Sequence, residues 1–160
     1  MLGGARSGKS GVAEALAARS GGPVTYLATA AVDPADVDHV ARVAAHQARR
    51  DRTWATIEAD ADLPAVLRAT VGTVLVDSLG TWVTAHADLT PDAAALCDAL
   101  RDRDGDTVVV SEEVGLGVHP SSELGRRFRD ALGAVNLAVA DVADAVLLVV
   151  AGRVLPLERP

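Results

Sequence analysis

A glycine-rich stretch near the start of the chain carries its one lysine. Residues 3–10 read GGARSGKS, and Lys9 is the single lysine beside fourteen arginines. The stretch fits G-x-x-x-x-G-K-[ST], in which glycines let the backbone wrap around phosphates, lysine supplies a compact cation and serine ligates magnesium. The broad, fixed fork of an arginine cannot act as a point charge between two phosphate groups. The pattern predicts a P-loop with Gly3, Gly8, Lys9 and Ser10 at its fixed positions. The alternative is a glycine-rich turn that matches by chance.

Carboxylates at predicted strand ends supply the second part of such a site. P-loop enzymes need an acidic residue at a strand end to organise magnesium and its waters. The run TVLVD places Asp77 at such an end, so Ser10 and Asp77 are the expected magnesium ligands. The alternative for Asp77 is a cap on the following turn. Glu112 and Glu113 also follow a predicted strand, and we expect them to face the same crevice.

A cationic stripe lies within PADVDHVARVAAHQARRDR, residues 34–52. On a helix its members would be spaced by three or four residues and so share one face: His39, Arg42, His46 and either Arg49 or Arg50. Charge alone fits a solvated helix face equally well. A histidine among arginines is nevertheless suited to attack phosphorus, because neighbouring cations keep the imidazole neutral and guanidiniums bind phosphate oxygens. This is the layout of a histidine that becomes nucleotidylated.

Short apolar runs alternate with longer amphipathic segments, and these elements must position the residues above. Strands are predicted at 24–28, 73–77, 106–111 and 145–151, and helices at 10–19, 34–50, 63–70, 92–103 and 122–143. The alternation predicts an α/β fold of the P-loop NTPase type, with a mostly parallel sheet and helices on both faces. Residues 152–160 are expected to return as an edge strand, because Pro156 fits poorly in a central one. Only Met1 and Leu2 precede Gly3, so the first strand is expected to be truncated.

Length and composition narrow the class of protein. The 160 residues, 49% hydrophobic and 2% aromatic, fit one domain over 1–160 with a core of Ala, Val and Leu. A net charge of −7 argues against nucleic-acid and anionic-membrane binding. Cys97 is the sole cysteine, which excludes an internal disulfide. The chain shows neither a membrane-spanning run nor a signal peptide, and a cytoplasmic location is expected.

Several motifs, taken in chain order, resemble those of one known family. They are GGARSGKS (3–10), YLAT (26–29), ARVAAHQARR (41–50), WATIE (54–58), LVDSLGTWV (75–83), VSEEVGLGVHP (110–120), RRFRDALGAVN (126–136) and ADAVLLVVAG (143–152). Nearly end to end, the chain resembles the bifunctional adenosylcobinamide kinase/adenosylcobinamide-phosphate guanylyltransferase of cobalamin biosynthesis. A P-loop occurs in many families, whereas its combination with R-x-x-x-H-x-x-x-R, W-x-T-x-E and EVGxG is specific.

The resemblance implies two reactions that need Mg²⁺. In the first, ATP or GTP phosphorylates the aminopropanol hydroxyl of adenosylcobinamide. In the second, GTP guanylylates a histidine and releases pyrophosphate, and the GMP group passes to adenosylcobinamide phosphate to give adenosylcobinamide-GDP. By motif that histidine is His46, and His46 and Lys9 are the expected catalytic residues. The resemblance also implies a homotrimer.

The resemblance further implies nucleotide contacts in five places. They are the P-loop residues Gly3, Gly4, Ala5, Arg6, Ser7, Gly8, Lys9 and Ser10, the turn Ala28, Thr29 and Ala30, the helical Gln47, Ala48, Arg49 and Arg50, and the acids Glu58 and Asp77. Three positions depart from the family pattern. Glu112 stands where an asparagine usually precedes EVG, His119 replaces an apolar residue before the proline, and Leu137 replaces a glutamine. Glu112 adds negative charge near the phosphate site.

Two other functions fit part of the pattern. A P-loop kinase for another small alcohol would need no nucleophilic histidine. A nucleotide-dependent switch would hydrolyse slowly and relay conformation to a protein partner. The sequence shows no exposed apolar segment for such a partner, which disfavours the switch.

Overall fold

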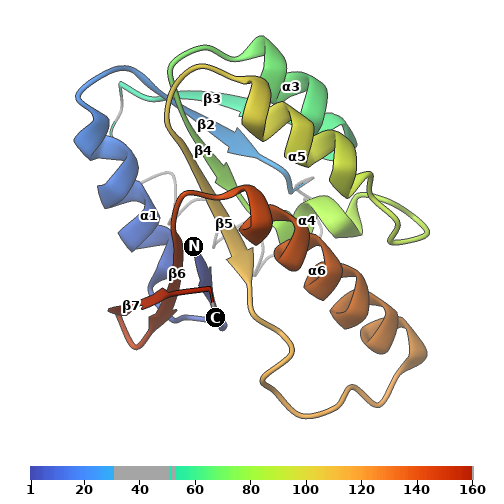
Figure 1. The fold of residues 1–160 in the computed structure, drawn as a ribbon. Helices are drawn as coiled ribbons and strands as arrows, with labels where there is room; N and C mark the ends of the chain where they lie inside the picture. The colour runs from blue at the N-terminus through green and yellow to red at the C-terminus, as the bar shows by residue number, and fades with distance from the viewer. Residues whose placement is uncertain (31–50, 52, 160) are drawn as a thin grey trace.

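A seven-stranded sheet forms the centre of the computed structural model, which describes residues 1–30, 51 and 53–159 (Figure 1). The strands are β1 (Leu2–Gly3), β2 (Val24–Ala28), β3 (Ala55–Glu58), β4 (Thr73–Asp77), β5 (Thr107–Glu112), β6 (Val146–Val150) and β7 (Arg153–Leu157). Their order across the sheet is β3-β2-β4-β5-β1-β6-β7. All neighbours pair in parallel except β6 and β7, which pair antiparallel. The predicted mostly parallel sheet and the returning edge strand are confirmed.

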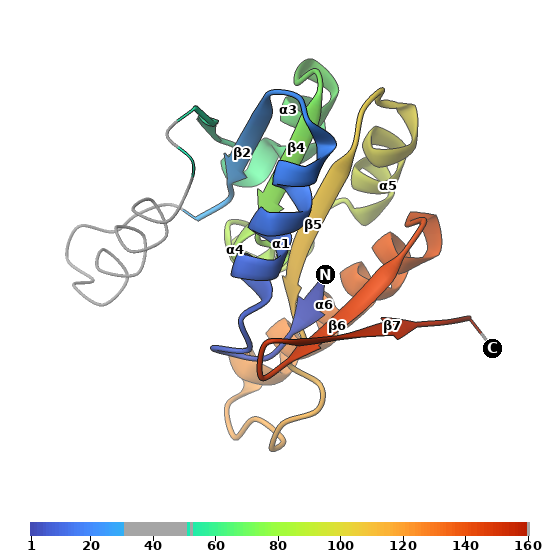
Figure 2. The same ribbon diagram turned by 90° about the vertical axis from the view of Figure 1, so that its left-hand side faces the viewer.

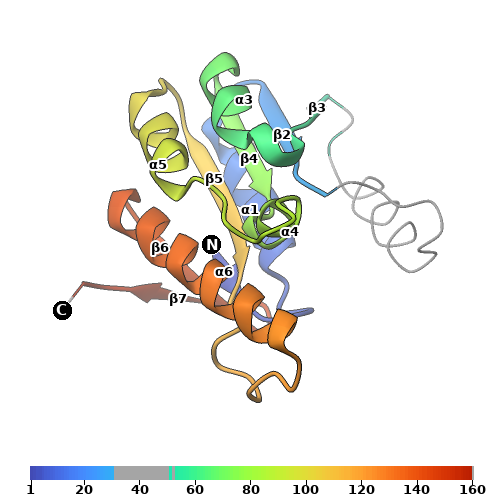
Figure 3. The same cartoon turned by 90° about the vertical axis from the view of Figure 1, so that its right-hand side faces the viewer.

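Helices cover both faces of this sheet. The helices are α1 (Lys9–Ala17), α3 (Leu63–Ala69), α4 (Leu79–Thr84), α5 (Ala93–Asp102) and α6 (Glu123–Val142), with 3₁₀ turns at Ala18–Ser20 and Asp60–Asp62. Figure 2 shows α1 in front of the sheet, and Figure 3 shows α3, α5 and α6 on the opposite side. Successive side chains of a strand point to opposite faces, so Leu75 packs with α1 whereas Val74 and Val76 pack with the other helices. Both cores are built mainly from small aliphatic side chains, as the composition predicts.

Local sequence explains where the helices begin. Asp92 accepts a hydrogen bond from the Ala95 amide at 2.9 Å, and Ser122 accepts one from the Gly125 amide at 3.1 Å. Ser78 and Thr81 form a reciprocal capping box at the start of α4. Each cap satisfies an amide that has no carbonyl partner in the first helical turn. A polar residue before α4, α5 and α6 thus fixes the start of each of these three helices.

Two described elements differ from the sequence prediction. β3 was not predicted because its four residues are all exposed, and so they lack an apolar pattern. α4 was not predicted because six residues are too few to show helical periodicity. β1 is two residues long, and the predicted helix 34–50 lies outside the described residues. Within the described ranges, no helix is both long and apolar enough to cross a membrane.

Candidate active site

The carboxyl ends of the parallel strands bring several predicted site residues to one edge of the sheet. Ala28 pairs with Glu58 on one side and with Asp77 on the other. Further along the same edge, Gly3 pairs with Glu112. Ligands of open α/β sheets bind outside these strand ends. Four stretches of sequence predicted to contact nucleotide therefore meet at one edge.

The glycine-rich stretch forms a tight loop between β1 and α1. A Cβ atom on Gly3 would lie 2.6 Å from the Ser7 hydroxyl oxygen and 2.8 Å from the Val149 carbonyl oxygen, so only glycine fits there. Gly8 caps α1 with a φ of 91°, a left-handed conformation that favours glycine. Lys9 and Ser10 are the first two residues of α1. The loop therefore aims the amides and the dipole of a helix N-terminus at the strand edge, which suits a phosphate.

Lys9 is held by a carboxylate of the neighbouring strand. Its Nζ lies 3.5 Å from Oε1 of Glu112, and the two side chains are 12% and 30% exposed. The other carboxylate oxygen, Oε2, accepts hydrogen bonds from the Ser78 hydroxyl at 3.0 Å and from the Gly80 amide at 3.1 Å. A Cβ at position 80 would collide with this carboxylate, whose carbon would lie 3.1 Å away, so glycine makes room for it. Glu112 is thus fixed by α4 while it pairs with Lys9.

The backbone that carries Glu112 is held by α6. The side-chain nitrogen Nδ2 of Asn136 donates to the backbone carbonyl oxygen of Glu112 at 3.1 Å. The side-chain oxygen Oδ1 of Asn136 accepts from the hydroxyl of buried Ser111 at 2.5 Å. Two side-chain hydrogen bonds therefore connect the end of β5 to α6. Sequence analysis missed this connection, since residues 111 and 136 are distant in the chain.

A buried threonine joins the turn after β2 to the start of α4. The Thr29 hydroxyl donates to the Ser78 carbonyl oxygen at 2.6 Å and accepts from the Ser78 amide at 2.9 Å. It also lies 2.6 Å from the hydroxyl of Thr81. Because Ser78 contacts Glu112 as well, hydrogen bonds link the predicted Ala28-Thr29-Ala30 turn to the carboxylate that holds Lys9. The sequence indicated Thr29 but gave no signal for the role of Ser78.

Asp77 ends β4, where its carboxylate accepts a hydrogen bond from the Tyr26 hydroxyl at 3.0 Å. No group of three or more His, Cys, Asp or Glu side chains that could enclose a metal occurs in the described ranges. Mg²⁺ bound to a nucleotide takes most of its ligands from phosphate and water and needs only one or two from the protein. The Ser10 hydroxyl and the Asp77 carboxylate are oxygen donors of the kind that this ion prefers, and their role as its ligands stays a prediction.

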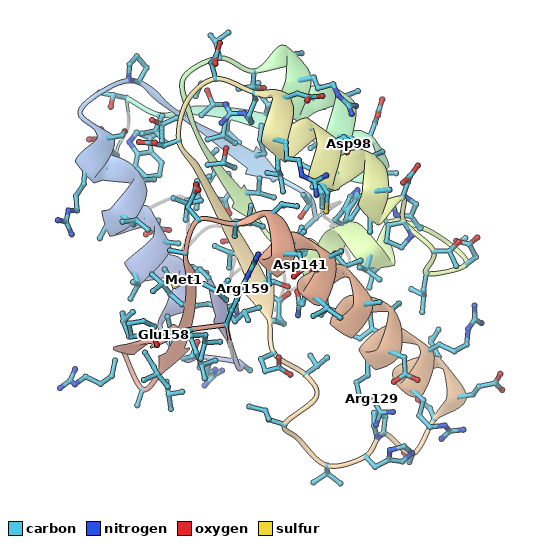
Figure 4. All side chains as sticks on the ribbon, viewed as in Figure 1. Met1, Asp98, Arg129, Asp141, Glu158 and Arg159 are labelled. Atoms are coloured by element: carbon cyan, nitrogen blue, oxygen red, sulfur yellow. The ribbon has the colours of Figure 1, made fainter. Side chains whose placement is uncertain are left out.

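Two other ion pairs of the described residues are more exposed. Arg101 pairs with Asp98 at 3.1 Å. Arg159 contacts Asp141 at 3.9 Å, and both residues are labelled in Figure 4. The side chains in both pairs are more than half exposed. Exposed pairs of this kind contribute little to stability, because water screens their charges. The pair between Lys9 and Glu112 is better shielded from water.

The predicted cationic stripe is not part of the described structure. The predicted nucleophile, the four predicted nucleotide contacts after it and the other stripe residues all lie outside the described residues. They are His46, then Gln47, Ala48, Arg49 and Arg50, and then His39 and Arg42. Their roles stay predictions. The segment follows directly on the Thr29-Ala30 turn at the strand edge and leads into β3, which ends at Glu58.

Comparisons with known proteins match nearly the whole length of the chain. Residues 1–157 match the family model described as cobinamide kinase / cobinamide phosphate guanyltransferase. The "Bifunctional adenosylcobalamin biosynthesis protein CobP" of Pseudomonas aeruginosa is 40% identical, over 99% of this chain and 95% of the relative. The proteins named "Bifunctional adenosylcobalamin biosynthesis protein CobU" of Escherichia coli and Salmonella typhimurium are 35% and 34% identical, each over 95% of this chain and 94% of the relative. A P-loop at the edge of a parallel sheet and these end-to-end matches lead to one conclusion: the chain belongs to the cobinamide kinase / cobinamide phosphate guanyltransferase family.

Proposed function

We propose that this protein phosphorylates adenosylcobinamide and then converts the product to adenosylcobinamide-GDP through a guanylylated His46. Membership of the family supports the pair of reactions. The observation that carries the proposal for this chain is the P-loop at the sheet edge, where Lys9 and the first turn of α1 form a site for a polyphosphate.

In the kinase step, the aminopropanol hydroxyl attacks the γ-phosphorus of ATP or GTP. A bond forms between that oxygen and phosphorus, the bond to the nucleoside diphosphate breaks, and the hydroxyl proton is lost to solvent. Lys9 and the α1 amides would stabilise the negative charge on the phosphate oxygens. Ser10 and Asp77 would hold Mg²⁺, which neutralises part of the phosphate charge when bound.

In the guanylyl transfer, a ring nitrogen of neutral His46 attacks the α-phosphorus of GTP and pyrophosphate leaves. A phosphate oxygen of adenosylcobinamide phosphate then attacks the same phosphorus and releases the imidazole, which leaves a diphosphate bond in the product. Arg49 and Arg50 would bind phosphate oxygens during both transfers. The motif R-x-x-x-H-x-x-x-R at residues 42–50 supports this assignment.

Four further properties belong to the same proposal. A single domain over residues 1–160 would carry both reactions, using the one P-loop in the sequence. ATP or GTP would serve the kinase step, and GTP the second step. The protein would act in the cytoplasm as a homotrimer, as the family resemblance and the sequence composition imply.

Labelling with GTP tests the covalent step. Purified protein is incubated with Mg²⁺ and GTP labelled at its α-phosphorus, denatured, and examined for label on the chain. We expect an acid-labile, base-stable label that is lost in His46→Ala, because a phosphoramidate has this stability. His39→Ala is the matched control, since it removes a histidine from the same predicted stripe and should keep the label. A folded protein that binds GTP and acquires no label would overturn guanylyl transfer and favour a simple kinase.

A further inference from the structure

The carboxylate of Glu112 lies next to the one lysine of the P-loop, and neither proposed reaction uses it. We infer that Glu112 competes with nucleotide phosphates for Lys9, so that a nucleotide must displace this carboxylate before Lys9 can bind its phosphates. The inference rests on the proposed nucleotide site and adds a residue that sets its affinity.

The two partners differ in how firmly they are held. One oxygen of Glu112 is bound by the Ser78 hydroxyl and the Gly80 amide, and the Asn136 side chain holds the backbone of the same residue. Lys9 carries its ammonium on a flexible four-carbon chain. When phosphates enter, the lysine can therefore turn toward them while the carboxylate stays in place.

The position of Glu112 determines the sign of its effect on binding. In the free protein its Oε1 lies 3.5 Å from the Lys9 ammonium and neutralises it. In the bound protein the fixed carboxylate would stay at the strand edge, close to the phosphate oxygens and of like charge. The pairing with Lys9 in the free protein and the repulsion of phosphate oxygens in the bound protein both oppose nucleotide binding. The repulsion grows with the charge on the ligand. Mg²⁺ lowers the ligand charge and should weaken the effect.

Glu112→Gln isolates the charge. The glutamine has nearly the same volume, and its amide oxygen can still accept from Ser78 and Gly80. We expect the Kd for a non-hydrolysable GTP analogue, measured by titration calorimetry, to fall by about 3- to 5-fold, the upper part of the range for ion pairs of this kind. The gain should be larger in EDTA than in Mg²⁺. An unchanged or higher Kd would overturn the inference.

Two further variants separate competition from other causes. Glu113→Gln makes the same change in net charge one residue later, at a carboxylate that accepts from the Gly115 amide at 2.7 Å. Its Kd should stay within about twofold of wild type. Glu112→Asp keeps the charge, and its Kd should also stay near wild type. A gain in either variant equal to that of Glu112→Gln would assign the effect to general charge or to packing, and would overturn the inference.

The single lysine provides a direct structural readout. Protein labelled with ¹³C at the lysine ε-carbon gives one lysine side-chain signal, because Lys9 is the only lysine. In the free protein, Glu112→Gln should shift this signal and Glu113→Gln should leave it in place. With the GTP analogue at saturation, wild type and Glu112→Gln should show nearly the same shift, since Lys9 then contacts phosphate in both. An unshifted signal in free Glu112→Gln would rule out the pair in solution.

These outcomes separate the inference from the proposed function. If wild type acquires no label from GTP but Glu112→Gln binds the GTP analogue more tightly than wild type, guanylyl transfer is excluded and the competition for Lys9 stands. Normal labelling alongside an unchanged Kd in Glu112→Gln would remove the competition alone.

Discussion

Two cations mark the opposite ends of strand β5, and they are held in different ways. Arg103 lies just before the strand, where its guanidinium donates to the carbonyl oxygens of Thr70 (3.2 Å), Gly72 (2.7 Å), Gly105 (3.0 Å) and Asp106 (3.2 Å) and to the Thr107 hydroxyl. Lys9 lies beside the far end of the strand, paired with one carboxylate at 3.5 Å. A cation with many fixed backbone partners holds loops together. A cation whose described charged partner is a single carboxylate can exchange that partner for a ligand.

The chemistry of the two side chains matches this division. The arginine fork points several donors in fixed directions, which suits the converging carbonyl groups of two loops. The lysine ammonium has three donors on a flexible chain, which suits a ligand that arrives and leaves. Exchanging each residue for the other type should therefore damage different properties of the protein.

The largest expected effect comes from Lys9→Arg. The guanidinium keeps the charge but cannot enter the space between two phosphate groups, so turnover in the kinase step should fall by a factor on the order of 100 or more. The midpoint of thermal unfolding should change little, because the exchange keeps the positive charge beside Glu112. A coupled assay for nucleoside diphosphate release and a thermal melt test both halves. Turnover within a few-fold of wild type would show that charge alone suffices at this position.

The reverse exchange, Arg103→Lys, should act on stability. A lysine cannot reach the carbonyl groups of both loops at once, so we expect the free energy of unfolding to fall by about 2 kcal/mol, the size of a few lost hydrogen bonds. Urea denaturation measures this change. Nucleotide affinity, measured where the variant is fully folded, should equal that of wild type. Weaker nucleotide binding with unchanged stability would contradict the proposed division of roles.

Gly105→Ala tests how closely the loops approach at the Arg103 end. Gly105 has a φ of 106°, and a Cβ there would lie 2.5 Å from the Gly72 carbonyl oxygen. We expect a loss of roughly 1 to 3 kcal/mol in the free energy of unfolding. Gly21→Ala is the matched control, because Gly21 has a φ of 74° with open space around the added carbon. Equal losses in the two variants would mean that backbone conformation, rather than close contact, accounts for the effect.

The smallest expected effect is that of Tyr26→Phe at the nucleotide end. The change removes the hydroxyl that donates to Asp77 at 3.0 Å and keeps the buried ring. We expect a loss of about 0.5 to 1.5 kcal/mol in stability. The Mg²⁺ concentration needed for half-maximal kinase activity should change by a few-fold, because the loss of one modest hydrogen bond alters an equilibrium by about that factor. An unaltered magnesium dependence would argue against Asp77 as a ligand.

Much of the fold could be predicted from short apolar runs and their spacing. β2 and β4 begin and end where predicted, and β5, β6 and α6 agree to within about a residue. The tight glycine-rich loop that leads into α1 could be predicted because glycine, lysine and serine at fixed spacing leave few other interpretations. Such features can be predicted from sequence, because they depend only on residues that are close together in the chain.

The rest of the site depends on contacts between distant residues. The pairing of Lys9 with Glu112 requires β1 to lie beside β5, and the bond from Ser78 to Glu112 requires α4 to start at the neighbouring strand. Strand order is a property of the whole chain, and no local pattern encodes it. The sequence indicated that Glu112 would face the crevice, but the choice of Lys9 as its partner needed three-dimensional positions.

The placement of β1 also affects how the protein folds. Leu2 pairs with Ser111 and with Leu148, so the first strand takes its place between two strands made much later. Contacts between residues so far apart in the chain close slowly, because the entropy of the intervening loop is lost before any pairing compensates for it. During synthesis from the N-terminus, the glycine-rich loop leaves the ribosome well before β5 and β6, the strands that flank β1. A nascent chain should therefore be unable to hold nucleotide until β6 has emerged.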